Sequence, residues 1–415
     1  MFNEIIEQKI MIKQAFIEHR IIMTPGPVEA DPRVLRAMTS PIIGQFDPAF
    51  LRLMDEVMEM SRQVFATENK WAYPINGTAR AGIEALLLAV IEPNDRVYVP
   101  IFGRFGHLLA EIAKRAQGDV LTTEKKLGEV YTFDELKKEI DSFSPKVVAI
   151  VHGESSTGMM QPLEELGHYC REQGILLIVD AVATLAGAEL ETDQWCLDGV
   201  VTGSQKCLAA PAGLSLITYN SKIEAIISER KKIEQGLDTT SVNSRMISSN
   251  YLDLSQLQEY WSPTRLNHHT EATSMLYAIH EALFLTLEEG LKNRIKRHAI
   301  NKKAIVDGLL AMGLEIFGDT QHQMPTITCV KVPDNVDANR VREALVNHFS
   351  IEIAPGFGPL KNKVWRIGAL GYSSRKQNVL LFLGAFEAVL SRFNAKIVPN
   401  KAVLKAMDIY EKHNV

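Results

Sequence analysis

Short apolar runs alternate with longer amphipathic segments along the first half of the chain, between residues 71 and 219. The apolar runs predict strands, and the amphipathic segments predict helices. Predicted strands cover residues 71–75, 96–102, 147–153, 175–183, 199–206 and 214–219, and predicted helices cover residues 82–90, 107–116 and 163–174. This alternation is typical of a mostly parallel α/β sheet flanked by helices. Residues 175–179 are apolar throughout, which predicts burial on both faces and places ligands at the carboxyl ends of the strands.

The pattern changes in the last third of the chain. A long helical pattern over residues 272–298 leads into two strand-like runs, 325–333 and 363–370, separated by a helix-like run, 337–348. This order predicts a smaller α+β layer. Because Pro25, Gly26 and Pro27 break any helix, we expect an N-terminal segment over residues 1–23. A large α/β domain would then cover residues 24–285 and a small C-terminal α+β domain residues 286–415.

Composition and charge narrow the class of protein. The 415 residues are 46% hydrophobic and 23% charged, with a net charge of −5 and no long basic block, which argues against nucleic acid as a partner. No apolar stretch is long enough to span a membrane, and charged residues interrupt the N-terminus where a signal peptide would be apolar. The four cysteines have no metal-ligand spacing and suit a reducing compartment, so we expect a cytoplasmic protein without a catalytic metal.

Two charged residues stand out from the apolar pattern. Asp180 ends a predicted buried strand, where a carboxylate is costly unless it meets a cation or a strong donor. It could cap a following helix, or it could hold the protonated ring nitrogen of pyridoxal phosphate. Lys206 follows another predicted strand among small, apolar and hydroxyl residues. In such surroundings the pKa of a lysine is lowered, and its amine becomes nucleophilic toward an aldehyde. The alternative, a lysine at the protein surface, is the more common case in general.

A phosphate site is predicted at residues 76–80, Asn-Gly-Thr-Ala-Arg, between a predicted strand and a predicted helix. Backbone N–H groups and a helix N-terminus hold phosphate in such turns. The turn is neither GxGxxG nor GxxxxGK[ST], which argues against nicotinamide cofactors and nucleoside triphosphates.

Taken together, these residues resemble a known family. The runs TPGP at 24–27, NGTAR at 76–80, HGESSTG at 152–158, DAVA at 180–183, GSQK at 203–206 and RIG at 366–368 are similar in kind and order to the class V aminotransferases of the pyridoxal-phosphate-dependent fold type I. The closest branch is the alanine/serine-glyoxylate group. The resemblance spans roughly residues 22–395. It implies a large domain built on a mostly parallel sheet, a small C-terminal domain and pyridoxal 5'-phosphate as cofactor.

The resemblance also implies roles for individual residues. Lys206 would form the Schiff base with the cofactor, Asp180 would hold the pyridine nitrogen, and Phe105 would stack on the ring. Residues at phosphate-binding positions are Thr78, Ala79, Gln205 and, from a neighbouring subunit, Thr270. Arg80 is also expected at the cofactor. Ser156 would lie beside both the cofactor oxygen and the substrate carboxylate, and Gly26 would line the same pocket. The guanidinium of Arg366 would bind that carboxylate. The role of Thr270 implies a homodimer with shared active sites.

Two departures from alanine-glyoxylate enzymes bear on the substrate. Gln45 and Asn267 stand where those enzymes usually carry histidine and tyrosine. Arg80, where they often carry histidine, is a further departure and concerns the phosphate side. A ureido group has both N–H donors and a C=O acceptor, which two amides complement. The pair resembles the (S)-ureidoglycine-glyoxylate aminotransferases of purine catabolism, which give glycine and an oxalurate-type 2-oxo acid. Alternatively, the two amides could merely satisfy backbone groups.

Other functions remain open at this point. Alanine or serine could be the amino donor to glyoxylate. A cysteine desulfurase shares the fold type, but it needs a cysteine on a mobile loop, and Cys329 lies in a strand-like run. A non-catalytic scaffold of the same fold is a further alternative.

Overall fold

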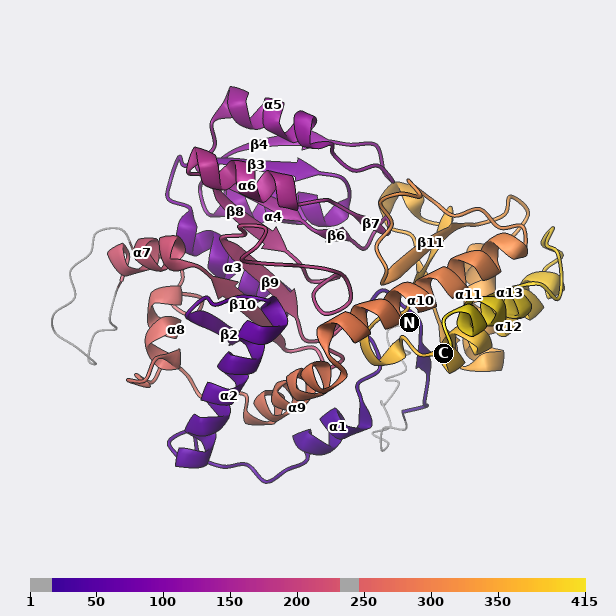
Figure 1. The fold of residues 1–415 in the computed structure, drawn as a ribbon, viewed down its shortest axis with the longest axis horizontal. Coiled ribbons are helices and arrows are strands. Elements are labelled where there is room, and N and C mark those ends of the chain that lie inside the picture. The colour runs from indigo at the N-terminus through magenta and orange to yellow at the C-terminus, as the bar shows by residue number, and fades with distance from the viewer. Residues whose placement is uncertain (1–16, 232–245) are drawn as a thin grey trace, which may run out of the picture.

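A seven-stranded sheet forms the centre of the larger part of the molecule (Figure 1). The computed structural model describes residues 17–231 and 246–415. The strands lie in the order β2-β10-β9-β8-β5-β3-β4, and all are parallel except β10, which runs antiparallel to both neighbours. Their bounds are β2 Trp71–Asn76, β3 Arg96–Ile101, β4 Asp119–Glu124, β5 Val147–Val151, β8 Leu176–Asp180, β9 Gly199–Gly203 and β10 Leu214–Tyr219. The predicted mostly parallel sheet is confirmed.

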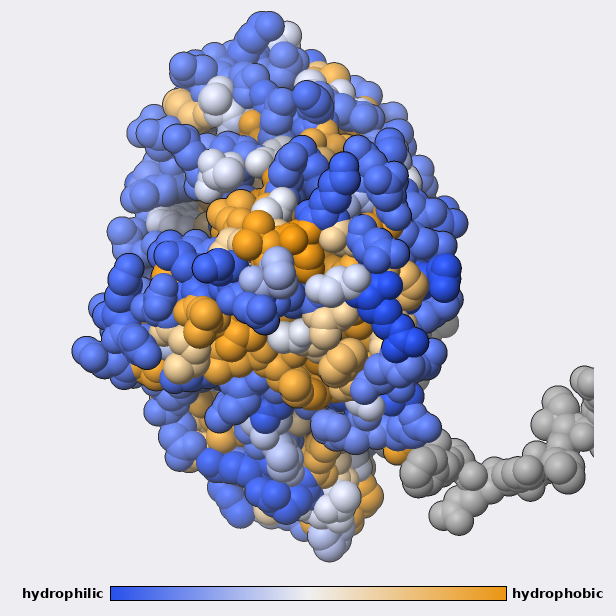
Figure 2. Space-filling view, turned by 90° about the vertical axis from the view of Figure 1, so that its right-hand side faces the viewer, coloured by the Kyte–Doolittle hydropathy of each residue, from blue (hydrophilic) through white to orange (hydrophobic). Residues whose placement is uncertain are grey.

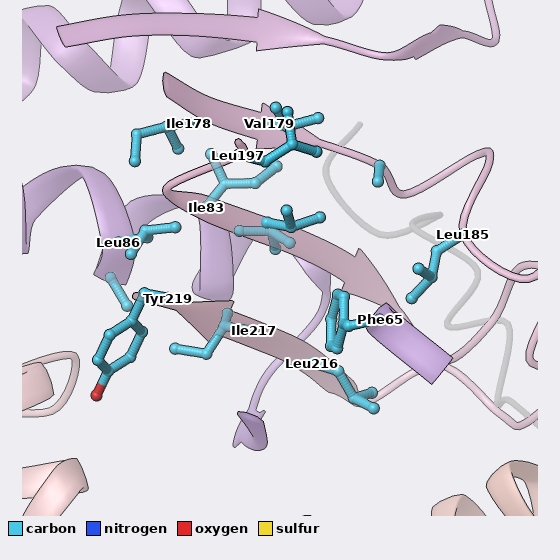
Figure 3. Close-up of a cluster of buried hydrophobic side chains, with 14 of the residues drawn as sticks. Phe65, Ile83, Leu86, Ile178, Val179, Leu185, Leu197, Leu216, Ile217 and Tyr219 are labelled. Atoms are coloured by element: carbon cyan, nitrogen blue, oxygen red, sulfur yellow. The ribbon is translucent and has the colours of Figure 1, made fainter. Parts of the chain in front are cut away.

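The sheet is buried on both faces because helices cover it. Strands β5, β8, β9 and β10 are buried along their whole length, as their unbroken apolar sequences predict. Figure 3 shows part of this core, where Ile83 and Leu86 pack with side chains of the central strands such as Ile178 and Ile217. The helices of this part are α1 Pro32–Met38, α2 Pro48–Phe65, α3 Ala79–Val90, α4 Arg104–Arg115, α5 Phe133–Phe143, α6 Glu164–Gln173, α7 Ser221–Glu229, α8 Leu254–Trp261 and α9 Thr273–Glu289.

A second, smaller sheet lies toward the C-terminus, in the order β11-β14-β13 with antiparallel pairing. Its strands are β11 Ile327–Lys331, β13 Ala354–Pro355 and β14 Val364–Gly368, and its helices are α10 Leu291–Ala311, α11 Ala338–Phe349, α12 Lys376–Arg392 and α13 Ala402–Lys412. Buried side chains from these elements form a hydrophobic cluster distinct from the one around the large sheet. The predicted small α+β unit is therefore present, while the boundary at residue 286 stays a prediction.

Residues near the start of the described chain pack with the C-terminal cluster, although they precede the large sheet in the sequence. Strand β1, Ile21–Ile22, pairs in parallel with β12, Ile351–Glu352, and Met23 is fully buried in the C-terminal cluster. Two short strands, β6 Gly153–Glu154 and β7 Met159–Met160, form a separate hairpin beside the large sheet. Residues 1–16 of the predicted N-terminal segment lie outside the described residues.

The long helical pattern predicted over residues 272–298 is divided between two helices. Helix α9 ends at Glu289 and α10 begins at Leu291, with Gly290 between them at a φ of 80°. Glycine adopts this left-handed conformation without steric cost, so the chain turns here although the apolar periodicity continues.

The surface has no sign of a membrane span in the residues described. No helix there is both long and apolar enough to cross a bilayer. Figure 2 shows one face of the molecule, on which hydrophilic side chains dominate the margins and apolar side chains gather toward the middle. Large exposed apolar side chains include Ile42 and Phe46, at 66% and 72%, on the connection between α1 and α2.

Candidate active site

A cavity of about 310 Å³ lies at the carboxyl edge of the large sheet, where β2, β8 and β9 all end. This is the edge at which parallel α/β sheets bind ligands. The predicted site residues that line it are Gly26, Thr78, Ala79, Arg80, Phe105, Asp180, Gln205 and Lys206. Other residues at the cavity are Pro27, Ile83, Leu108, Gly153, Ser155, Val182, Ala183 and Ala212. The turn after β2, the end of β8 and the segment after β9 thus converge as the sequence predicts.

Lys206 projects into this cavity from the segment that follows β9. Its ammonium group donates a hydrogen bond to the carbonyl oxygen of Pro25. Burial lowers the pKa of the Lys206 amine to about 8, and the positive charge of Arg366 acts in the same direction. A lysine with this pKa carries a useful fraction of the nucleophilic neutral form near neutral pH.

Gly26 is required where it lies against this lysine. Its φ is 126°, and a Cβ built there would lie 2.7 Å from the Lys206 Nζ atom. Any larger residue would therefore displace the amine. The Thr24–Pro27 turn is further held by a hydrogen bond from the Thr24 hydroxyl to the Pro27 carbonyl oxygen, at 3.1 Å.

Asp180 ends β8 at the floor of the cavity and is only 5% exposed. Burial raises the pKa of the Asp180 carboxyl to about 6, while a hydrogen bond of 2.9 Å from the Val182 N–H favours the charged form. The carboxylate thus caps the turn after β8, but one backbone donor does not offset its burial. A cationic group in the cavity would stabilise the charged form.

The N-terminus of α3 also lines the cavity. Thr78 is the N-cap residue of this twelve-residue helix, and its side chain makes no capping hydrogen bond. Thr78, Ala79 and Arg80 all line the cavity, so the positive end of the helix dipole faces it. Within the described part of the chain, the buried Gln205 Oε1 atom has no hydrogen-bond partner. These features together fit a phosphate group.

Arg366 lies on β14, next to the cavity, and belongs to the smaller sheet. Its Nη1 donates to the Ser155 carbonyl oxygen at 3.0 Å, and its Nε donates to the Pro355 carbonyl oxygen at 2.7 Å. The guanidinium also stacks on the ring of Phe357, 3.9 Å from its centroid. Burial lowers the pKa of Arg366 to about 10, which leaves it charged at neutral pH. Because Ser155 lines the cavity, this guanidinium lies next to it, and arginine is suited to binding a carboxylate.

Besides Arg366, four predicted site residues are not among the residues that line the cavity within one chain. Ser156 is buried behind it, and its hydroxyl accepts from the Arg104 N–H and donates to Glu154. Gln45, Asn267 and Thr270 lie elsewhere, on the α1–α2 connection and on the segment before α9. The Gln45 side-chain amide donates to Asn267 Oδ1 at 2.7 Å. The two amides thus pair with each other, and Gln45 Oε1 has no partner among the described residues.

Sequence reasoning missed three residues that shape the site. Glu154 accepts a hydrogen bond from the Ser156 hydroxyl. The Ser155 carbonyl oxygen accepts from Arg366, and the ring of Phe357 stacks on the same guanidinium. Glu154 and Ser155 lie inside the HGESSTG run, so the motif pointed to them without assigning a role. Phe357 gave no signal, because its contact with Arg366 depends on the turn between β13 and β14.

The residues at the cavity fit pyridoxal 5'-phosphate. The N-terminus of α3 can bind the phosphate, and the buried carboxylate of Asp180 can pair with the ring nitrogen. Lys206, whose pKa is lowered, can react with the aldehyde. Cys329 cannot serve a desulfurase, because it is buried in β11 and burial raises the pKa of its thiol to about 12.

Comparisons with known proteins agree with this reading. Residues 43–359 match the family model for aminotransferase class-V. The chain is 53% identical to the (S)-ureidoglycine–glyoxylate transaminase of Bacillus subtilis over 397 residues, which is 94% of this chain and 95% of that protein. It is 36% identical to the alanine–glyoxylate aminotransferase of Rattus norvegicus over 88% of this chain and 86% of that protein.

Solved structures show the same relationship. A crystal structure of ureidoglycine-glyoxylate aminotransferase from Bacillus subtilis matches with a TM-score of 0.92 at 51% identity, covering 96% of this chain and all of that one. A crystal structure of alanine–glyoxylate aminotransferase from Nostoc sp. matches with a TM-score of 0.87 at 37% identity, covering 92% and 98%. Fold and cavity define a pyridoxal-phosphate-dependent aminotransferase of fold type I. Within that class, the chain belongs to the class V aminotransferase family.

Proposed function

We propose that this enzyme transfers the amino group of (S)-ureidoglycine to glyoxylate, giving glycine and an oxalurate-type 2-oxo acid. The observation that carries the choice of donor is the hydrogen bond between the Gln45 and Asn267 side chains, which leaves one amide oxygen without a partner. An amide pair that is not used by the backbone can offer both donors and an acceptor to a ureido group. Similarity to a relative named for this reaction supports the same choice.

The residues at the cavity divide the chemistry between them. When bound, pyridoxal phosphate supplies an electron sink for the negative charge that develops at the donor Cα atom. Asp180 would hold the ring nitrogen in its protonated form, and the amine of Lys206 would accept the proton from the donor Cα atom. Arg366 binds the carboxylate that both substrates share, so that each substrate is held in one orientation. Phe105, which lines the cavity, would pack against the ring face.

We further propose a homodimer in which Gln45, Asn267 and Thr270 of one subunit complete the active site of the other. Gln45 and Asn267 are hydrogen-bonded to each other, and Thr270 follows three residues after Asn267. None of the three lines the cavity of its own chain. The same connection exposes the apolar side chains of Ile42 and Phe46, which a second copy would cover. The four cysteines are free thiols, which suits the reducing cytoplasm, where we place the enzyme.

Donor competition tests the substrate. Purified enzyme is given glyoxylate with equal concentrations of ureidoglycine and alanine, and then of ureidoglycine and serine, and the 2-oxo products are measured. We expect the product of ureidoglycine to dominate in both mixtures. A preference for alanine or serine would refute the proposed donor and leave the aminotransferase class intact.

Subunit complementation tests the shared site. Lys206→Ala and Thr270→Val chains are each expected to be inactive, and they are then unfolded and refolded together in equal amounts. If residues act across the dimer, half of the dimers carry one intact site, and about a quarter of the wild-type activity returns. No recovery in the mixture, with dimers present, would contradict sharing of the site.

A further inference from the structure

A fully buried carboxylate lies directly behind the cavity. Glu154, on β6, is 0% exposed. Its Oε1 atom accepts the N–H of Ser156 at 2.9 Å and the hydroxyl of Ser156 at 2.6 Å, and its Oε2 atom accepts the N–H of Phe105 at 2.8 Å. Both oxygens therefore act as acceptors. Because the Ser156 hydroxyl itself accepts from the Arg104 N–H, its proton points at Glu154.

The same carboxylate caps a helix that it does not belong to. Helix α4 begins at Arg104, and its N-cap residue, Gly103, has no side chain to bind the free N–H groups of the first turn. Glu154 supplies the missing acceptor from β6 through the Phe105 N–H. A negative charge at a helix N-terminus is also favoured by the helix dipole. Burial raises the pKa of Glu154, and these donors oppose that shift.

Gly103 leaves the space that this contact needs. A Cβ atom at Gly103 would lie 2.3 Å from the Glu154 Cγ atom and 2.4 Å from its Cδ atom. Its backbone is extended, with a φ of 170°, which alanine can also adopt. The obstacle to alanine is therefore the clash of its Cβ atom with the Glu154 side chain. The carboxylate and the glycine thus fit each other sterically.

This carboxylate fixes two sides of the cavity at once. Phe105 lines the cavity directly, and Ser155, which precedes Ser156, lines it and accepts from Arg366. We infer that Glu154 is a positioning residue of the active site: by binding Phe105 and Ser156 together, it sets the distance between the ring-packing wall and the carboxylate-binding wall. The inference rests on the proposed site for pyridoxal phosphate, but not on the choice of amino donor.

Three variants test this role. Glu154→Gln keeps the shape but places an NH₂ group against either Phe105 or Ser156, where two donors would face each other. Gly103→Ala keeps the carboxylate and displaces it. Asp198→Asn is the matched control, because Asp198 is also buried and accepts from the Leu177 N–H at 2.9 Å and from the Asn220 amide at 2.7 Å, but it does not line the cavity.

The readouts are the dissociation constant of the apoprotein for pyridoxal phosphate and the visible circular dichroism of the bound cofactor. We expect Glu154→Gln and Gly103→Ala each to raise the dissociation constant about tenfold or more, as for loss of a charge-assisted hydrogen bond, and to change the dichroism. Asp198→Asn should lower the unfolding temperature without changing either readout. If Glu154 had only a structural role, all three variants would show a lower unfolding temperature with an unchanged dissociation constant and unchanged dichroism.

The outcomes separate this inference from the proposed function. Folded Glu154→Gln and Gly103→Ala proteins with wild-type affinity and dichroism would overturn the role of Glu154 alone. If Glu154→Gln does not fold, Gly103→Ala decides by the same criterion. A wild-type protein that does not bind pyridoxal phosphate would instead overturn the proposed function.

Discussion

The side chains of Gln45 and Asn267, 222 positions apart in the sequence, form a hydrogen bond of 2.7 Å. Neither side chain uses the backbone for this contact, so the possibility that the two amides only satisfy backbone groups does not describe this pair. The contact fixes the position of one amide relative to the other, and we expect that the two bind the substrate together.

Replacing this pair should change the donor preference. In Gln45→His/Asn267→Tyr, a ureido group would lose its donors and acceptor, so we expect kcat/KM for ureidoglycine to fall about tenfold or more, with kcat/KM for alanine unchanged or higher. Transamination rates with each donor at fixed glyoxylate measure this. Gln63→His, on the exposed face of α2, is the control. Equal loss with both donors would show that the pair serves structure only.

Arg366→Lys tests carboxylate binding by the guanidinium fork. Lysine keeps the charge but loses the bidentate geometry and the stacking on Phe357, so we expect KM to rise about 10- to 100-fold for both glyoxylate and the amino donor. Steady-state kinetics with each substrate varied separately give the two values. Arg340→Lys, which also removes an arginine stacked on a phenylalanine, should leave both unchanged. An effect on one substrate alone would contradict a shared carboxylate site.

Asp180→Asn tests the electrostatic role of the buried acid. An amide cannot stabilise a protonated ring nitrogen, so we expect kcat to fall by about 10²- to 10³-fold with little change in KM. Single-turnover measurements of the first half-reaction isolate this step. Wild-type rates in the variant would mean that Asp180 serves only as the cap for the Val182 N–H.

The rate of cofactor capture should depend on pH through Lys206. Only the neutral amine attacks an aldehyde, and burial lowers the pKa of Lys206 to about 8, so its reactive fraction rises as pH rises through 8. Mixing apoprotein with pyridoxal phosphate in a stopped-flow instrument at a series of pH values gives the midpoint. We expect it near pH 8, and a midpoint near 10.5 would show that the amine is not shifted.

The sequence predicts the parts of this protein that depend on local pattern. The continuous apolar runs identify the buried strands β5, β8, β9 and β10, and the residues at their ends identify Asp180 and the segment of Lys206. Strand β4 was not predicted, because it is an edge strand whose residues are polar and only partly buried. The periodicity also could not show the break at Gly290, where one conformation divides a continuous apolar pattern.

Contacts between distant segments lie beyond such reasoning. The buried Glu154 was visible in the sequence, but its role depends on the start of α4, which comes 50 residues earlier and meets β6 only in the fold. Likewise, Ser156 was expected to face the cofactor. In the structure its hydroxyl donates to Glu154 and accepts from the Arg104 N–H. Its direct contact with cofactor or substrate stays a prediction.

Chemical trapping of the cofactor tests the central claim most directly. Borohydride reduction of the loaded enzyme fixes pyridoxal phosphate to the lysine that holds it, and peptide mass spectrometry then locates the label. Lys302 provides an internal comparison, because burial lowers the pKa of its amine to about 7, but it donates to the Ile327 carbonyl oxygen and does not line the cavity. We predict a single label on Lys206. A label on Lys302 or another lysine, or none at all, would contradict the account.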